Sequence, residues 1–301
     1  MQIQIQDLSM TYPSGKQALQ RLDLDLTSPS LVGLLGPNGA GKSTLMKLLV
    51  AALLPTQGSI LVDGRPLDRS QRALKARLGY LPQSFGLYDE LTVYQFLDYM
   101  AALKGLRNSR SAIDQVIRAV NLEEKRRARI RTLSGGQRQR VGIARALALN
   151  PEFIVCDEPI SALDVSIQAQ VVNMLMKFQR ELGLTYLFIA HDLSMVRHIA
   201  DETAVMYLGT MVEYGPTEEV YGHPAHPYTQ GLLSAVPVAD PDYEKTHHRI
   251  PMEGEVPSPI DPKPGCRFCG RCPRATEQCR TQTPAPKDLS GGHFAACHHL
   301  D

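Results

Sequence analysis

Residues 36–43 spell GPNGAGKS and directly follow the apolar run Leu31–Leu35. The apolar run predicts a buried strand, and the glycines allow a tight loop whose backbone N–H groups turn inward around phosphates. At its end, a lysine can place a charge on the β- and γ-phosphates and a serine hydroxyl can bind Mg²⁺. The helix expected there, over residues 42–54, points its positive end at the same anion. The stretch therefore predicts a phosphate-binding P-loop made by Gly36, Pro37, Asn38, Gly39, Ala40, Gly41, Lys42, Ser43 and Thr44.

A second apolar run, Phe153–Cys156, ends in the two carboxylates Asp157 and Glu158. Continuous apolar runs are typical of strands buried on both faces of a parallel sheet, and ligands bind at the carboxyl ends of such strands. We expect Asp157 to hold Mg²⁺ through its water shell and Glu158 to polarise the attacking water. The alternative is a solvated acidic pair, which the nearby P-loop motif makes the weaker interpretation.

The segment Leu133–Gln137 reads LSGGQ and opens an amphipathic helical pattern. Ser134 is expected to cap this helix, and the glycines after it expose backbone donors, so the segment predicts a second anion-binding helix terminus. A bare SGG is more often a flexible turn. Two such termini far apart in one chain suggest half-sites that meet across a dimer.

Taken in order and spacing, GPNGAGKST, LSGGQ and FIVCDEP resemble the ATPase of ABC transporters, over roughly residues 1–235. The resemblance implies that ATP and Mg²⁺ are the ligands and that the fold is an α/β P-loop NTPase. It also implies a mainly parallel sheet, N-terminal antiparallel strands and an inserted helical lobe at about 86–145. A small Cys-rich extension follows at 236–301, after the nucleotide-binding domain at 1–235.

The same resemblance assigns further residues to the site. Gln83 matches the glutamine that joins the two lobes and senses Mg²⁺ and γ-phosphate, and His191 matches the switch histidine on that phosphate. Tyr12 matches the aromatic that stacks on adenine, although a buried structural tyrosine remains the alternative. Contacts to a nucleotide bound by the partner subunit are implied for Ser134, Gly135, Gly136 and Gln137, and a place at the dimer seam for Ser161, Ala162, Leu163 and Asp164.

Composition limits the function. The chain has 301 residues and a net charge of +1, so no overall field favours nucleic acid. The basic run Lys125–Arg131 has no interleaved aromatic residues and is interpreted as a solvated face. No stretch of 18 apolar residues predicts a membrane span, and the start of the chain has no signal-peptide pattern. We therefore expect a peripheral protein at the cytoplasmic face of the membrane, with transmembrane permease subunits on separate chains.

Five of the six cysteines lie in 266–297, after the proline-rich stretch 237–264, which predicts an extended linker. Clustered thiols in a cytosolic protein suggest a metal site rather than disulfides. The spacing leaves an iron–sulfur cluster, zinc and free thiols open. Cys156, on the apolar run, is expected to be a core residue.

The segments 226–237, 254–268, 271–279 and 292–299 resemble the tail of oligopeptide/dipeptide-permease ATPases. That resemblance implies a [4Fe–4S] cluster on Cys266, Cys272, Cys279 and Cys297, with zinc as the alternative and Cys269 as an extra thiol. The front half, with 78–83 and 87–93, resembles exporter-type ATPases instead, so the chain combines two patterns.

Function follows from both resemblances. We expect ATP hydrolysis coupled to oligopeptide or dipeptide uptake, with a second ABC ATPase subunit forming a homo- or heterodimer. Permease subunits and an extracytoplasmic peptide-binding protein complete the expected system. The alternative is the ATPase of a drug or polysaccharide exporter, or a hybrid chain. A soluble ABC protein of ribosomes or DNA is disfavoured because the chain has one nucleotide domain and no long heptad run. A regulatory module without turnover is disfavoured by Glu158 and His191.

Overall fold

The computed structural model describes residues 1–83, 86–106, 109–148, 150–161, 163–237, 249–260 and 262–300. Expectations for Ala162 and for the linker residue Pro241 lie outside these ranges. The chain divides into two units, which are described separately. The first consists of Met1–Ile3, Leu26–Leu31 and Val62–Ile189, and the second of Gln4–Asp25, Val32–Leu61 and Ala190–Asp301.

The sheet of the first unit is parallel, as the apolar runs predict. Strand β7 (Phe153–Asp157) pairs in parallel with β6 (Leu78–Leu81) on one side and with β8 (Thr185–Ile189) on the other. Every residue of β8 is buried, and so are the first four residues of β7. A short strand, β5 (Arg65–Pro66), precedes them. Asp157 thus ends the middle strand of the three, at the edge where parallel sheets bind ligands.

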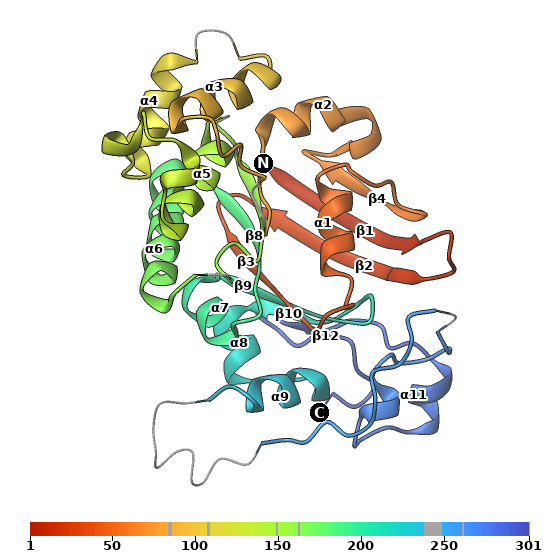
Figure 1. Ribbon diagram of the computed structural model, residues 1–301. Helices are drawn as coiled ribbons and strands as arrows, with labels where there is room; N and C mark the ends of the chain where they lie inside the picture. The colour runs from red at the N-terminus through yellow and green to blue at the C-terminus, as the bar shows by residue number, and fades with distance from the viewer. Residues whose placement is uncertain are drawn as a thin grey trace. The chain divides into compact units, whose positions relative to one another are not determined.

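The first unit also contains helices. They are α2 (Leu67–Arg77), α3 (Val93–Leu103), α4 (Arg110–Ala119), α5 (Gly135–Leu147) and α6 (Val165–Leu182), with single 3₁₀ turns at Glu123–Lys125 and Ile130–Thr132. Figure 1 shows α3 and α4 together, with α5 beside them. Thr92 begins α3 with a reciprocal cap, since its hydroxyl accepts from Gln95 N and the Gln95 side chain accepts from Thr92 N. The expected helical lobe therefore contains α3, α4 and most of α5.

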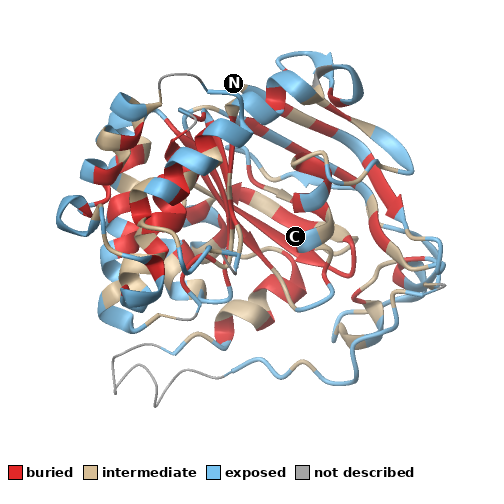
Figure 2. Cartoon of the chain, turned by 45° about the horizontal axis from the view of Figure 1, so that its top comes forward, coloured by how far each residue is buried: buried red, intermediate tan, exposed pale blue. Residues whose placement is uncertain are grey.

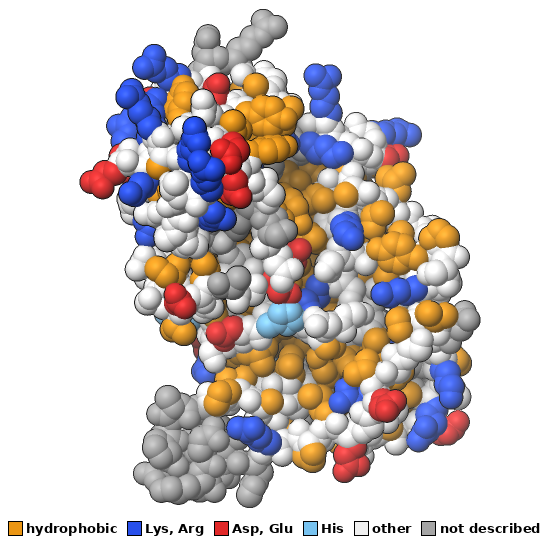
Figure 3. All heavy atoms as spheres, in the orientation of Figure 1, with side chains coloured by type: hydrophobic (Ala, Val, Ile, Leu, Met, Phe, Trp, Pro, Cys, Tyr) orange, Lys and Arg blue, Asp and Glu red, His pale blue; other side chains and the backbone are white. Residues whose placement is uncertain are grey.

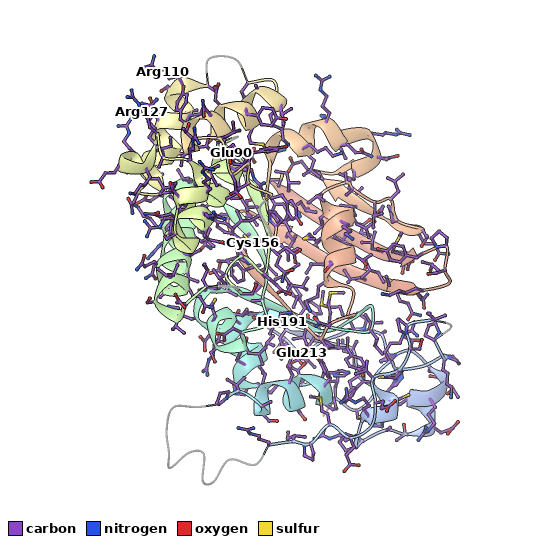
Figure 4. All side chains as sticks on the ribbon, viewed as in Figure 1. Glu90, Arg110, Arg127, Cys156, His191 and Glu213 are labelled. Carbon is purple, nitrogen blue, oxygen red and sulfur yellow. The ribbon has the colours of Figure 1, made fainter. Side chains whose placement is uncertain are left out.

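The basic run lies on this lobe. Arg126 forms an ion pair of 2.8 Å with Asp114 and stacks 4.4 Å above the ring of Tyr94. Figure 3 shows Lys and Arg side chains gathered over α3 and α4, and Figure 4 shows Arg110 and Arg127 pointing outward. The run is a partly ion-paired, solvated face, as its composition indicates.

The second unit contains the P-loop and most of the N-terminal antiparallel strands. Strand β1 (Gln2–Thr11) lies between β2 (Gln17–Thr27) and β4 (Gln57–Val62). Strand β3 (Leu31–Leu35), fully buried, pairs in parallel with β9 (Glu202–Tyr207). Strand β10 (Thr210–Pro216) runs antiparallel to β9 and also to β12 (Phe294–Ala295), which pairs with β11 (Lys287–Asp288). The C-terminal extension thus adds strands to β10.

The described part of the second unit contains the short helices α1 (Lys42–Leu49), α7 (Leu193–Ile199), α8 (Thr217–Gly222), α9 (Pro227–Ser234) and α11 (Glu277–Thr281), with a 3₁₀ turn at Cys269–Arg271. The first helix is shorter than the predicted 42–54. It ends because Ala51 adopts a φ of 52°, which breaks the right-handed helix.

Aromatic packing joins the extension to the second unit. The ring centroid of Phe268 lies 5.3 Å from that of Tyr207 and 5.4 Å from that of Tyr228. All three side chains are buried. Figure 2 shows the buried residues concentrated along the strands and on one side of the helices. Burial of three large rings stabilises the docking of the extension by several kcal/mol, at roughly 25 cal/mol for each Å² of apolar surface.

Candidate nucleotide-binding site

The P-loop connects β3 to α1 in the second unit. The ammonium of Lys42 donates to the carbonyl oxygens of Gly36 at 2.5 Å and Pro37 at 3.0 Å, and the residue is only 6% exposed. Gly41 has a φ of 104°, and a Cβ there would lie 2.5 Å from Ala18 O. Only glycine fits this position, which directs the backbone into the first turn of α1. The loop therefore encloses a cation next to a helix N-terminus.

Tyr12 lies beside the P-loop. Its hydroxyl is 3.2 Å from Thr44 Oγ1, and its backbone closes the turn before β2 through Tyr12 N to Lys16 O at 2.9 Å. The side chain is partly exposed, and its hydroxyl end lies at the loop that was predicted to bind the triphosphate. The structure thus brings together two of the sequence-predicted elements.

His191 precedes α7 and also lies next to the P-loop (Figure 4). It lines a pocket of about 250 Å³ together with Gly36 and Pro37. The next residue, Asp192, fixes the local backbone because its carboxylate accepts from Met195 N at 3.1 Å and caps α7. His191 is therefore held near the start of the loop, beside Gly36 and Pro37.

In the first unit, Gln83 and Glu158 form a direct contact. Gln83 Nε2 donates to Glu158 Oε2 at 3.0 Å, and Asp157 lies one residue earlier at the end of β7. Glu158 has a φ of 47°, an uncommon conformation for a residue other than glycine. Its N–H donates to Ile189 O at 3.0 Å, which holds this turn. Strained backbone of this kind is often found at functional sites.

The predicted cap of α5 is present. Ser134 accepts from Gln137 N, and the Gln137 side chain accepts from Ser134 N, so both polar residues of the LSGGQ motif are used at the helix start. Gly136 packs closely, because a Cβ there would lie 2.8 Å from Ile167 Cγ2, while one on Gly135 would meet Leu163 only at 3.9 Å. The buried Gln139 side chain donates to Pro159 O. The α5 start is thereby tied to the segment after Glu158.

Asp164 lies immediately before α6, in the same segment. The Gln168 side chain donates to Ile160 O at 3.1 Å and to Leu163 O at 3.0 Å, so it orders the loop that carries Asp164. The site residues thus form two sets, each within one unit. Gln83, Asp157, Glu158, Asp164 and Ser134 to Gln137 lie in the first unit, and the P-loop, Tyr12 and His191 in the second.

The cysteines of the C-terminal extension lie close to one another. Cys279 Sγ lies 3.4 Å from His299 Nε2, and Cys266 N donates to Cys279 O at 2.8 Å. Burial, with smaller contributions from neighbouring thiols, raises the pKa of Cys266 to about 11, and burial also raises the pKa of Cys272. All six cysteines are free, and among the described residues no three such side chains converge to hold a single metal ion. Cys156 is fully buried on β7, as predicted for a core residue.

One buried polar cluster was not predicted. Glu213, on β10 and 1% exposed, accepts from Ala225 N at 2.8 Å and His226 N at 2.9 Å, and lies 2.8 Å from His293 Nε2. Figure 4 labels Glu213 at this position. His293 belongs to the extension, so the cluster joins it to β10. The sequence signal was weak, because an isolated Glu and a distant His have no recognisable spacing.

Comparison with known proteins identifies the family. Residues 19–161 match the ABC transporter family, and residues 212–279 match the family described as the oligopeptide/dipeptide transporter C-terminal region. A putative oligopeptide transport ATP-binding protein of Bacillus subtilis is 43% identical, over 98% of this chain and 94% of the relative. The chain belongs to the ATP-binding proteins of ABC transporters.

Further matches agree with this assignment. A putative peptide import ATP-binding protein of Brucella ovis is 40% identical, over 98% of this chain and 96% of the relative. Among solved structures, a subunit of the cbiONQ ABC transporter complex from Clostridium perfringens has a TM-score of 0.69 and 28% identity, covering 73% of this chain and 90% of that chain. A dimeric ATP-binding cassette with ADP and phosphate has a TM-score of 0.63 and 26% identity, with coverage of 71% and 98%.

The predicted fold class, the P-loop NTPase of ABC ATPases, is therefore confirmed. The chain is an ABC-type ATPase, with ATP and Mg²⁺ as its ligands. The relatives named for peptide transport align over the front half as well as the back half, since each covers 98% of the chain.

Proposed function

We propose that this ATPase energises the uptake of oligopeptides or dipeptides through separate membrane subunits. The extension carries the proposal, because residues 212–279 match a family described by oligopeptide and dipeptide transport, and relatives named for peptide import align almost end to end. Among the described helices, none is both long and apolar enough to cross a bilayer. A peripheral place at the cytoplasmic face, permease partners and an extracytoplasmic peptide-binding protein complete the proposal.

The proposed reaction uses the two sets of site residues in a dimer. The P-loop holds the phosphates. Ser43 would bind Mg²⁺ directly and Asp157 would hold it through its water shell, while Tyr12 stacks on the base. Ser134, Gly135, Gly136 and Gln137 of a second subunit, with its Asp164 loop, close the site. Glu158 polarises the attacking water and His191 contacts the γ-phosphate.

The contact between Gln83 and Glu158 gives this reaction a control step. Glu158 Oε2 accepts from Gln83 Nε2 at 3.0 Å, so one oxygen of the proposed base is occupied. Binding of Mg²⁺ and γ-phosphate by Gln83 would release that oxygen for the water. Hydrolysis would then depend on a complete ligand, which is the behaviour required of a pump.

Substitution of the proposed base tests this assignment. Glu158→Gln keeps the shape of the side chain but removes its basicity, so ATP turnover is expected to fall at least 100-fold while ATP binding persists and the dimer accumulates. Size-exclusion chromatography with Mg·ATP and a phosphate-release assay measure the two effects. Asp192→Asn, which retains an acceptor for the α7 cap, is the matched control. Normal turnover in Glu158→Gln would contradict the assignment.

We further propose that the extension holds a [4Fe–4S] cluster on Cys266, Cys272, Cys279 and Cys297. Unbridged, closely grouped thiols support it. A [4Fe–4S] cluster takes four cysteine thiolates, one for each iron, and the extension supplies four cysteines in the pattern that the family resemblance implies. When bound, the cluster would fix the extension structurally.

Iron and sulfide analysis after anaerobic purification tests this proposal. Cys272→Ser is expected to lose bound iron, because a serine cannot replace a thiolate as a soft ligand. Cys269→Ser, the matched control, is expected to retain it. Stoichiometric zinc without sulfide in the parent protein would contradict the cluster.

A further inference from the structure

The C-terminal extension reaches the pocket beside the P-loop. The lining of the 250 Å³ pocket combines Gly36, Pro37 and His191 with Met252 and Arg271 from the extension. All of these residues lie in the second unit. Gly36 and Pro37 begin the P-loop, whereas the helix that receives the phosphates begins at Lys42. The carbonyl oxygens of Gly36 and Pro37 also accept from the Lys42 ammonium, the group expected to contact the β- and γ-phosphates, so the pocket borders the part of the loop where those phosphates are expected.

Arg271 is held in a defined orientation. Its Nε donates to Glu253 O at 3.2 Å and its Nη2 to Met252 O at 3.0 Å, while Nη1 lies 3.5 Å from the Tyr207 hydroxyl. These are neutral oxygens on two parts of the unit, the consecutive residues Met252 and Glu253 and the side chain of Tyr207 on β9. A guanidinium carries five N–H donors in a rigid fork, so these contacts fix its plane and leave donors on Nη1 available.

The charge of Arg271 is weakly compensated. No carboxylate in the described part of the chain lies within ion-pairing distance of it, and its remaining pocket neighbours are mainly apolar: Pro37, Ala190, Leu193, Tyr228, Leu232 and Met252. Apolar surroundings reduce screening, so the field of an uncompensated cation extends further than it would at an open surface. Arg271 is therefore placed to act on an anion at the P-loop.

We propose that Arg271 is a nucleotide-positioning residue, which favours ATP over ADP by placing a positive charge at the γ-phosphate end of the site. The inference rests on the proposed P-loop role and deepens it. The γ-phosphate, which ADP lacks, adds negative charge beside the pocket. The Arg271 guanidinium therefore stabilises bound ATP more than bound ADP. The extension thereby contributes directly to the ATPase site and is more than a structural appendage.

Nucleotide affinities test the proposal. In a Glu158→Gln background, which prevents turnover, displacement of a fluorescent ATP analogue gives the Kd of ATP and of ADP separately. Arg271→Gln is expected to raise the Kd of ATP about three- to tenfold, as the loss of one unit charge acting through a partly screened medium predicts, and that of ADP less than twofold. Arg271→Lys keeps the charge and is expected to restore the Kd of ATP to within about twofold.

Arg280→Gln is the matched control, because Arg280 is an exposed arginine of the same extension, 4.0 Å from Glu277. It is expected to change neither Kd. An unchanged ATP affinity in Arg271→Gln would overturn the proposal, and so would an equal rise for ATP and ADP, which indicates a structural role. If the parent protein fails to bind ATP, or if Lys42→Ala binds it normally, the proposed P-loop role is wrong instead. Urea unfolding midpoints confirm that each variant is folded.

Discussion

Replacement of Glu213 tests how the extension is attached to the ATPase. Its carboxylate is almost fully buried, and three groups depend on it: Ala225 N, His226 N and His293 Nε2. Glu213→Ala removes the acceptor from all three at once. A buried donor left without a partner costs about 1–3 kcal/mol, and breaking a buried charged cluster typically costs about 3–5 kcal/mol. We expect the free energy of unfolding to fall by about 3–5 kcal/mol. It falls by less than the full cost of three unpaired donors, because water can enter part of the vacated space and hydrate them.

Thermal and urea unfolding followed by circular dichroism measure this loss. For a chain of 301 residues the melting temperature is expected to fall by roughly 5–8 °C. Glu213→Gln retains an acceptor oxygen and is expected to lose about half as much. Glu219→Ala, which removes an exposed carboxylate on α8, is the matched control and is expected to change stability by less than about 0.5 kcal/mol. A loss below about 1 kcal/mol in Glu213→Ala would refute the reasoning.

Three further predictions concern the site and its supports. Lys42→Ala is expected to weaken ATP binding at least tenfold in calorimetry, because it removes the cation inside the P-loop, and unchanged affinity would count against that role. Gly136→Ala is expected to destabilise the fold by about 1–3 kcal/mol through the clash with Ile167, whereas Gly135→Ala, whose new Cβ would make an ordinary contact of 3.9 Å with Leu163, is not; equal urea midpoints would contradict the packing argument. Burial lowers the pKa of His226 to about 4, so the unfolded chain binds a proton more readily and stability falls by up to about 3 kcal/mol as the pH drops from 6.5 to 4; His226→Asn should flatten this slope, and an unchanged slope would refute it.

Much of the fold could be predicted from local patterns. Strands such as Phe153–Asp157 and Thr185–Ile189 are continuous apolar runs, and this pattern requires burial on both faces. The cap at Ser134 follows from residues three apart, so short-range chemistry determines it. The end of α1 was predicted less well, because the positive φ of Ala51 has no signal in its side chain.

Contacts between distant residues could not be predicted in this way. Glu213 and His293 are 80 residues apart, and Arg271 meets the P-loop pocket from more than 200 residues away. Both contacts depend on how the extension packs on β10 and on the ring of Phe268, which is a tertiary property. The motifs indicated which chemistry to expect, whereas the place of the extension beside the P-loop pocket is visible only in the folded structure.

Peptide uptake by cells tests the central claim most directly. The chromosomal copy is replaced by the Glu158→Gln variant, and accumulation of a radiolabelled tripeptide is measured beside that of an unrelated sugar, with protein levels matched by immunoblot. The account predicts that tripeptide accumulation falls to background while sugar uptake is unchanged. Tripeptide accumulation at the parental rate, with the variant protein present and inactive in ATP hydrolysis, would contradict it.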